Sequence, residues 1–193
     1  MHYTGNPCDT AQANANYFQT GSREASAHLF VDDTSIYQGV ELLDSAWHCG
    51  ANTYYHNACR NTNSIGIEMC TSGNHLISDK TKENGAYVCA YICKMLRITA
   101  SQVDTNVLRH YDVTHKSCPA QMVTNPAERT AFKAMVKNIL NSGAATTTET
   151  ANTASTATTV KAGQKLTHRI TNSTSNVGKT GQVTSCIDSK YVV

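Results

Sequence analysis

The chain has 193 residues, a length typical of one domain with an additional segment rather than of two full domains. Hydrophobic residues make up 40% and charged residues 16% of the sequence, which excludes a charged disordered tail and a collagen-like fibre. The formal net charge of +2, without a block of Lys and Arg, argues against a dedicated nucleic-acid-binding protein. No stretch approaches the roughly 20 apolar residues of a transmembrane helix, so we expect no membrane insertion.

The amino terminus and the cysteines both indicate synthesis in a reducing cytoplasm. The first ten residues, MHYTGNPCDT, have neither the basic start nor the apolar core of a secretory signal peptide. The 8 cysteines are spread over the chain without a CxxC pair, and several lie in apolar patterns. We therefore expect mostly reduced thiols that pack as small hydrophobic groups.

The first third of the chain predicts a helix followed by a hairpin. Asp9 or Thr10 can cap a helix that continues to about Phe18. The segments Ala27–Val31 and Ile36–Val40 are rich in strand-forming residues and flank a short polar turn, which predicts two antiparallel strands.

The central part of the chain continues this mixture of strands and helices. Ser64–Cys70 alternates with the period of a strand, and Lys80–Leu96 has apolar residues at helical spacing. Val107–His110 is predicted to be a short strand. Asn125, followed by Pro and then Glu, predicts a capped helix that runs to Leu140. Strands interleaved with helices predict an α/β fold in which helices flank a mixed β-sheet.

The composition changes sharply at Asn141. Residues Asn141–Thr159 are rich in Thr, Ala and Ser and lack an apolar period, which predicts a flexible linker. The remaining segment, Val160–Val193, has few large apolar residues. A segment of this size seldom folds alone without disulfides or metal, so we expect it to be part of a module.

The densest polar cluster of the sequence extends from His110 to Pro119 and contains a histidine and a cysteine eight residues apart. A histidine and a cysteine separated by a loop can bind one Zn²⁺, although a polar loop with an incidental cysteine is the simpler alternative. A catalytic zinc ion needs three protein ligands and an open position. The candidates for a third ligand are the remaining histidines: His2, His28, His48, His56, His75, His115 and His168.

Five motifs in one order give the chain a resemblance to a known family. They are His2-Tyr3-Thr4-Gly5-Asn6, Ser26-Ala27-His28, Ala46-Trp47-His48, the run Asn63–Glu68, and His110 with Lys116, Cys118 and Pro119. Together they resemble the zinc-dependent N-acetylmuramoyl-L-alanine amidases of the type-2 amidase and peptidoglycan-recognition-protein superfamily, most closely phage and prophage endolysins. The resemblance covers residues 1–140 and implies an amidase domain with a zinc cleft on one face of its sheet.

The resemblance also implies a role for individual residues of this sequence. By position, His2, His110 and Cys118 match the three zinc ligands of the family. Glu68 matches an acidic residue that accepts a proton from the attacking water, and Lys116 matches a lysine that stabilises the oxyanion. Zinc is the cofactor that this set implies.

Three further residues match the walls of the cleft and are candidates for contact with substrate: His28, Trp47 and His48. The alternatives are a histidine packed within its strand for His28 and a structural role for Trp47. Some relatives have a tyrosine where this chain has Ala27, so the catalytic role of Glu68 becomes more important here. The family also has an apolar strand before the first zinc histidine, whereas only Met1 precedes His2. We therefore expect either a truncated chain, or a mostly missing first strand with its ligand on a frayed terminus.

In such endolysins a linker commonly leads to a module that binds the cell wall. Lys161–Leu166 resembles the opening strand of a small β module, so residues 160–193 are expected to be a truncated module or an unstructured tail.

The expected function is hydrolysis of the amide bond between N-acetylmuramic acid and L-alanine in peptidoglycan, on the cell wall after release from the cell. A recognition protein that binds peptidoglycan without cleaving it is the main alternative. A cysteine peptidase with Cys118 as nucleophile is a third, although such enzymes usually place the cysteine before the histidine, at a helix start. Peptidoglycan is the expected partner; the sequence does not indicate an oligomeric state.

Overall fold

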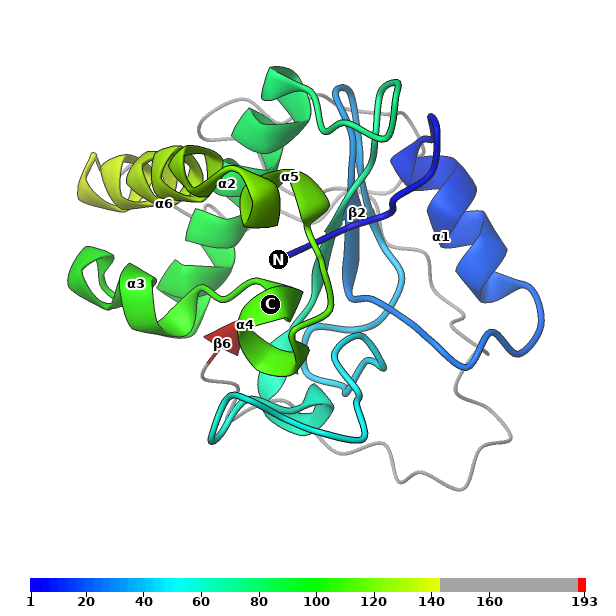
Figure 1. Cartoon of the computed structure of the whole chain (residues 1–193), viewed down its shortest axis with the longest axis horizontal. Coiled ribbons are helices and arrows are strands. Elements are labelled where there is room, and N and C mark those ends of the chain that lie inside the picture. Colours follow the sequence, from blue (N-terminus) through cyan, green and yellow to red (C-terminus); the bar gives the residue numbers. More distant parts are fainter. Residues whose placement is uncertain (143–190) are drawn as a thin grey trace, which may run out of the picture.

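The computed structural model describes residues 1–142 and 191–193. Most of the expected linker and C-terminal segment, including the strand expected at Lys161–Leu166, lies outside the described residues. Helices lie on both sides of a central sheet, and the N and C ends are marked near the middle of the molecule (Figure 1).

The central sheet is mixed, as expected. Its strands are β1 (His2–Tyr3), β5 (Ile67–Met69), β2 (Leu29–Val31) and β3 (Ile36–Gln38), in that spatial order. β1, β5 and β2 are parallel, whereas β2 and β3 are antiparallel neighbours. The last pair is the hairpin that the sequence predicts.

A second, two-stranded sheet consists of β4 (Ser64–Ile65) and β6 (Tyr191–Val192), which are parallel. The sequence predicts one strand over Ser64–Cys70, and the structure divides it at Gly66 into β4 and β5. A side chain at Gly66 would start only 2.6 Å from Cγ of His48, so this position needs a residue without a Cβ.

Two long helices cover one face of the sheet. α2 (Asp79–Met95) begins at Ser78, whose hydroxyl accepts the Thr81 N–H, and α6 (Pro126–Asn141) begins at the predicted cap Asn125. The two helices pack against each other (Figure 1). Asn141 therefore ends α6 rather than starting the linker. Their shared core includes Leu29, Val31, Ile67, Met69, Ile92 and Phe132.

α1 (Ala11–Gln19) covers the other face, with Thr10 as its cap. Successive residues of a strand point to opposite faces, so Phe30 contacts the α1 side while its neighbours in β2 contact the α2 side. Phe18 of α1 stacks on Phe30, with ring centroids 5.3 Å apart.

The strand predicted over Val107–His110 is wrong. Val107 makes only an isolated bridge, and His110 is the first residue of helix α4 (His110–Thr114). The helix begins here because the Asp112 carboxylate accepts the Arg109 backbone N–H at 2.8 Å, an end-capping contact that fixes the first turn.

The short elements complete the fold: α3 (Val103–Asn106), α5 (Ala120–Thr124) and the 3₁₀ helices η1 (Asn61–Asn63) and η2 (Ala100–Gln102). Among the described residues, no helix has both the length and the apolar character to cross a bilayer. The cysteines of the described residues are all free; Cys8 is exposed, and the buried ones are Cys49, Cys59, Cys70, Cys89, Cys93 and Cys118.

Candidate metal centre

Three side chains from distant parts of the chain meet at one point. His2 comes from β1, His110 from the start of α4, and Cys118 from the loop before α5. All three are buried, and their potential ligand atoms lie within 4.8 Å of one another. The Nδ1 atoms of the two histidines are 3.1 Å apart, and Sγ of Cys118 is 3.9 Å from His2 Nδ1. Two nitrogens and one sulfur at these distances can hold a metal ion.

Strand register places His2 and Glu68 next to each other. The two residues are opposite one another in the parallel pair β1–β5, so their side chains leave the sheet on the same face. On the other edge, the His110 N–H donates to the carbonyl of Met1. His2 is only 1% exposed, so the structure shows a paired and buried segment instead of the frayed terminus that we expected.

Burial keeps both histidines neutral. Desolvation, followed by the charge of the nearby amino terminus, holds the pKa of His2 well below its usual range. Desolvation and the charge of Lys116 lower the pKa of His110 to about 3. Burial has the opposite effect on the thiol and raises the pKa of Cys118 to about 12. At neutral pH a metal ion therefore meets two free imidazoles and must displace one proton, from Cys118.

His48 orients the first of these histidines, a role that the sequence did not indicate. His48 Nδ1 lies 3.0 Å from His2 Nε2, and His48 Nε2 lies 3.2 Å from the Ser64 hydroxyl. Ser64 donates its own proton to the carbonyl of Arg60, so it accepts from His48. We assign Nε2–H to both rings on this network, which leaves the Nδ1 lone pair of His2 directed at the ligand cluster.

Glu68 lies beside the ligand set. Its Oε1 is 3.9 Å from His2 Nδ1, and its side chain is 21% exposed. Its buried Oε2 has no hydrogen-bond partner among the described residues. Desolvation raises the pKa of Glu68 to about 7, against the opposing charges of the amino terminus and Lys116. A carboxylate with this pKa can take up and release a proton near neutral pH.

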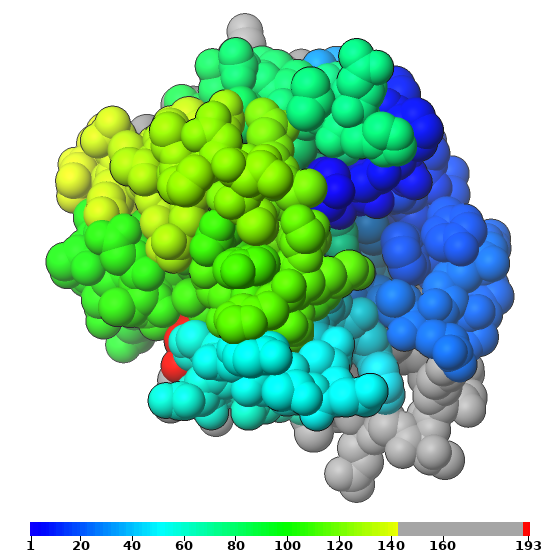
Figure 2. Space-filling view, viewed as in Figure 1, coloured from blue at the N-terminus to red at the C-terminus, as the bar shows by residue number. Residues whose placement is uncertain are grey.

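The ligand set opens into a cleft of about 780 Å³ that also contains Glu68 and Lys116 in its walls. The space-filling view shows the surface hollowed where the blue N-terminal residues meet the green segment that contains α4 (Figure 2). Trp47 lines the cleft and remains 46% exposed, so its ring is available to a ligand. His48 also lies in the cleft wall, although its ring nitrogens are engaged with His2 and Ser64.

His28 has the packed position that was the alternative to a contact with substrate. Its side chain is buried and does not line the cleft. Its Nδ1 accepts the Gly66 N–H at 2.9 Å, and its Nε2 lies 2.9 Å from the carbonyl of Asp44. Both ring nitrogens are therefore engaged in holding two loops together, and this position does not support the contact with substrate that the sequence suggested.

Comparison with known proteins gives a consistent result. The family model described as N-acetylmuramoyl-L-alanine amidase matches residues 1–121. A probable N-acetylmuramoyl-L-alanine amidase of Bacillus licheniformis is 33% identical over 150 residues, which cover 72% of this chain and 41% of that protein. The amidase BlyA of Bacillus subtilis (strain 168) is 33% identical over 149 residues, covering 71% of this chain and 40% of that one. The chain thus spans about two fifths of the length of these relatives.

Solved structures are also similar to this chain in fold and in sequence. The catalytic domain of PlyG aligns with a TM-score of 0.60 at 30% identity, covering 71% of this chain and 78% of that structure. PlyL aligns with a TM-score of 0.59, also at 30% identity, covering 70% of this chain and 80% of that structure.

Proposed function

Because the chain belongs to the N-acetylmuramoyl-L-alanine amidase family, we propose that it hydrolyses the amide bond between N-acetylmuramic acid and L-alanine in peptidoglycan, with zinc as its cofactor. The observation that best supports this proposal is the convergence of His2, His110 and Cys118 in a cleft that also contains an unpartnered carboxylate oxygen of Glu68.

The donor set fits a zinc ion by distance and by chemistry. With bonds of about 2.0–2.1 Å to nitrogen and 2.3 Å to sulfur, a tetrahedral ion spaces two nitrogens about 3.3 Å apart and a nitrogen and a sulfur about 3.6 Å apart. The corresponding distances to His2 Nδ1 are 3.1 Å from His110 Nδ1 and 3.9 Å from Cys118 Sγ. Imidazole and thiolate are ligands that zinc favours, and three of them leave a fourth position open.

The surrounding residues would each perform one part of the hydrolysis. When bound, zinc would lower the pKa of water and polarise the scissile carbonyl. Glu68 would accept the proton of the attacking water and pass it to the leaving nitrogen as the carbon–nitrogen bond breaks. Lys116 would stabilise the negative charge that develops on the carbonyl oxygen. The products are a free carboxylate on the lactyl group of the sugar and a free amino group on L-alanine.

The cleft offers a surface for the glycan as well as for the peptide. Its rim includes the exposed ring of Trp47, held in place because its backbone N–H donates to the Ser26 hydroxyl at 2.9 Å. An aromatic ring at the rim of a cleft is suited to packing against the apolar face of a sugar. We infer that the chain acts on the cell wall once it has reached it.

A product assay on purified peptidoglycan tests the proposal. We expect new amino groups on alanine and no new reducing ends, together with loss of activity in a chelator and recovery with zinc. New reducing ends would instead identify a glycosidase, and a new amino terminus on another residue would identify a peptidase. Binding to the cell wall without any product would identify a recognition protein.

A further inference from the structure

The first and last described residues of the chain meet beside β4 and β5. β6 pairs with β4 in parallel and β1 pairs with β5 in parallel. The N and C marks lie next to each other in Figure 1. The opposed residues are Tyr191 and Ser64, Val192 and Ile65, His2 and Glu68, and Tyr3 and Met69.

The register of the two pairings is continuous. Between the paired positions on one side only Gly66 and Ile67 remain, and on the other side only Val193 and Met1 remain. Two residues therefore oppose two residues. If a peptide bond joined Val193 to Met1, one regular parallel strand would result, with no residue missing and none in excess.

Hydrogen bonds bridge the break on both edges. The Val193 N–H donates to the Ile65 carbonyl and the Val193 carbonyl accepts the Ile67 N–H, both at 2.8 Å. On the opposite edge, the Leu108 N–H donates to the Val192 carbonyl at 2.8 Å, and the Leu108 carbonyl accepts from the amino terminus of Met1. In a parallel pair, one residue bonds in this way to two residues that flank its position on the neighbouring strand. Leu108 thus bonds to Val192 and Met1 as it would to two residues of a single continuous strand.

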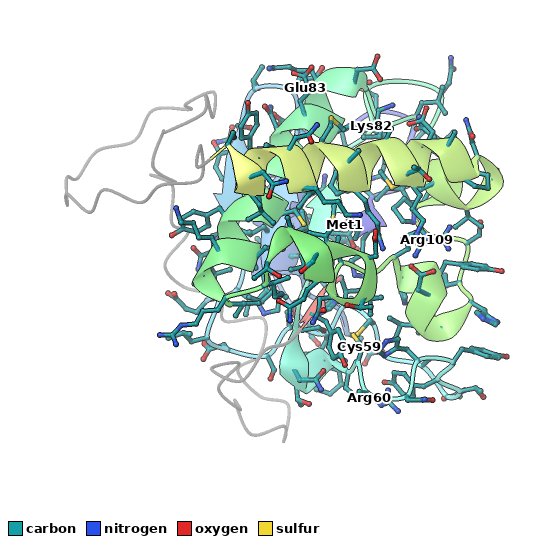
Figure 3. All side chains as sticks on the ribbon, turned by 90° about the vertical axis from the view of Figure 1, so that its left-hand side faces the viewer. Met1, Cys59, Arg60, Lys82, Glu83 and Arg109 are labelled. Carbon is teal, nitrogen blue, oxygen red and sulfur yellow. The ribbon has the colours of Figure 1, made fainter. Side chains whose placement is uncertain are left out.

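The side chains alternate through the break without a change of phase. Val192 and Met1 lie in the core beneath α2 and α6, whereas Val193 between them packs with Cys59 in the opposite cluster. Figure 3 labels Met1 between α6 and the segment that contains Cys59. His2 continues the alternation and faces the cleft. This is the period of two that a single continuous strand requires.

The position of Met1 also disfavours a charged group. Met1 is only 2% exposed, so the group at its backbone nitrogen is buried. An uncharged backbone amide would be less costly to bury at this point, and it would donate to the same Leu108 carbonyl.

We propose that Tyr191–Val193 and Met1–Tyr3 are two halves of one split strand, in which Tyr191–Val193 holds His2 in position and Val193 and Met1 occupy consecutive places. The fold should then accept a chain in which these two residues are joined. The proposal goes beyond the hydrolytic reaction and rests on it only in treating His2 as a metal ligand.

A rearranged chain tests the proposal with the same residues. After a start methionine, it begins at Val160, continues through Val193 directly into Met1, and ends at Thr159. Joining the two halves removes the entropic cost of bringing them together across the intervening residues. In metal-free buffer we expect an unchanged far-ultraviolet circular dichroism spectrum and a melting temperature about 5–15 °C above that of the original chain. Failure to fold, or a lower melting temperature, would overturn the proposal.

Two matched chains test the register. In the first, one alanine is inserted between Val193 and Met1, which would turn every side chain of one half to the wrong face. In the second, the same alanine is inserted after Thr146, outside the described residues. The first should melt well below the directly joined chain and lose more zinc on dialysis, whereas the second should match it. Equal stability of the two would contradict the continuous register.

A substitution in the original chain order provides an independent check. Val192→Asp places a charge in the core beneath α2 and should lower the melting temperature in metal-free buffer by more than about 10 °C. Tyr191→Phe, at the half-buried neighbour, should change it little. An unchanged melting temperature for Val192→Asp would show that β6 does not dock.

All of these readouts are independent of turnover, so a stable but inactive chain would contradict only the proposed reaction.

Discussion

Glu68 and the metal ligands have separate tasks that single substitutions can distinguish. Glu68→Gln keeps the size of the side chain and removes its ability to accept a proton. We expect turnover of peptidoglycan to fall about 10²- to 10⁴-fold while zinc content stays the same. The control is Glu83→Gln on the exposed side of α2, which should retain the parent rate. A parent rate for Glu68→Gln would mean that another group accepts the proton.

Cys118 is the ligand whose loss should release the metal. A hydroxyl is a much poorer ligand for zinc than a thiolate, so Cys118→Ser should lose most of its zinc during dialysis. Cys8→Ser removes an exposed thiol outside the ligand set and should retain zinc. Metal content measured by atomic emission after dialysis compares the two. Full occupancy in Cys118→Ser would remove this residue from the ligand set.

His48 should affect the metal without contacting it. His48→Phe keeps an aromatic ring but removes the nitrogen 3.0 Å from His2 Nε2, so the ring of His2 would lose the partner that fixes its orientation. We expect zinc affinity to fall about 10- to 100-fold in competition with a chromogenic chelator. His75→Phe, at an exposed position, should leave the affinity unchanged. Equal affinities would show that His2 is oriented by its backbone alone.

At the level of the elements, Gly66 between β4 and β5 connects the sheet to the metal centre, because it packs against the ring of His48. A methyl group at Gly66 would lie 2.6–2.9 Å from three atoms of the buried His48 ring. Gly66→Ala should therefore displace that ring, lower the free energy of unfolding in urea by about 1–3 kcal/mol, and weaken zinc binding. Gly50→Ala, whose new methyl would meet only an Asn61 side-chain atom at 3.3 Å, should have a smaller effect on both. An unchanged stability for Gly66→Ala would show that this position accommodates a Cβ.

The elements that the sequence predicts best are those with strong local signals. The hairpin of β2 and β3, helix α2 and helix α6 with its Asn125 cap all follow from periodicity and end-capping residues. The start of α4 at His110 was missed because its signal is one side chain, Asp112, which accepts the Arg109 N–H. β6 could not be predicted, because its partners lie more than a hundred residues away in the sequence.

The candidate site shows the same difference between residues that a sequence pattern indicates and residues whose role depends on distant contacts. Family position indicates His2, His110, Cys118 and Glu68, and the structure brings all four together in one cleft. The functions of His28 and His48 depend on contacts with Gly66 and His2 across the sheet. No pattern within a few residues of either histidine encodes these contacts, so the sequence could not separate a structural role from contact with substrate.

For the molecule as a whole, the metal centre lies where the sheet meets the α4–α5 region. One ligand comes from the sheet and two come from the α4–α5 region, so a bound ion would tie these two parts together. Zinc at about a thousand times its dissociation constant should stabilise the folded state by about 4 kcal/mol. We expect the melting temperature to fall by about 10 °C when a chelator removes the ion, as followed by circular dichroism. An unchanged melting temperature would mean that no metal binds the folded chain.

The distribution of the thiols has a consequence for the lifetime of the protein. In the folded chain Cys8 is open to reagents, whereas six other cysteines of the described residues are buried. Cys118 lines the cleft, and the other five become reactive only when their segments open. Outside a cell, where oxidants are present, an opened molecule can form wrong disulfides before it refolds. The working lifetime there would be set by how often the molecule opens, and the rate at which buried thiols become labelled would measure it directly.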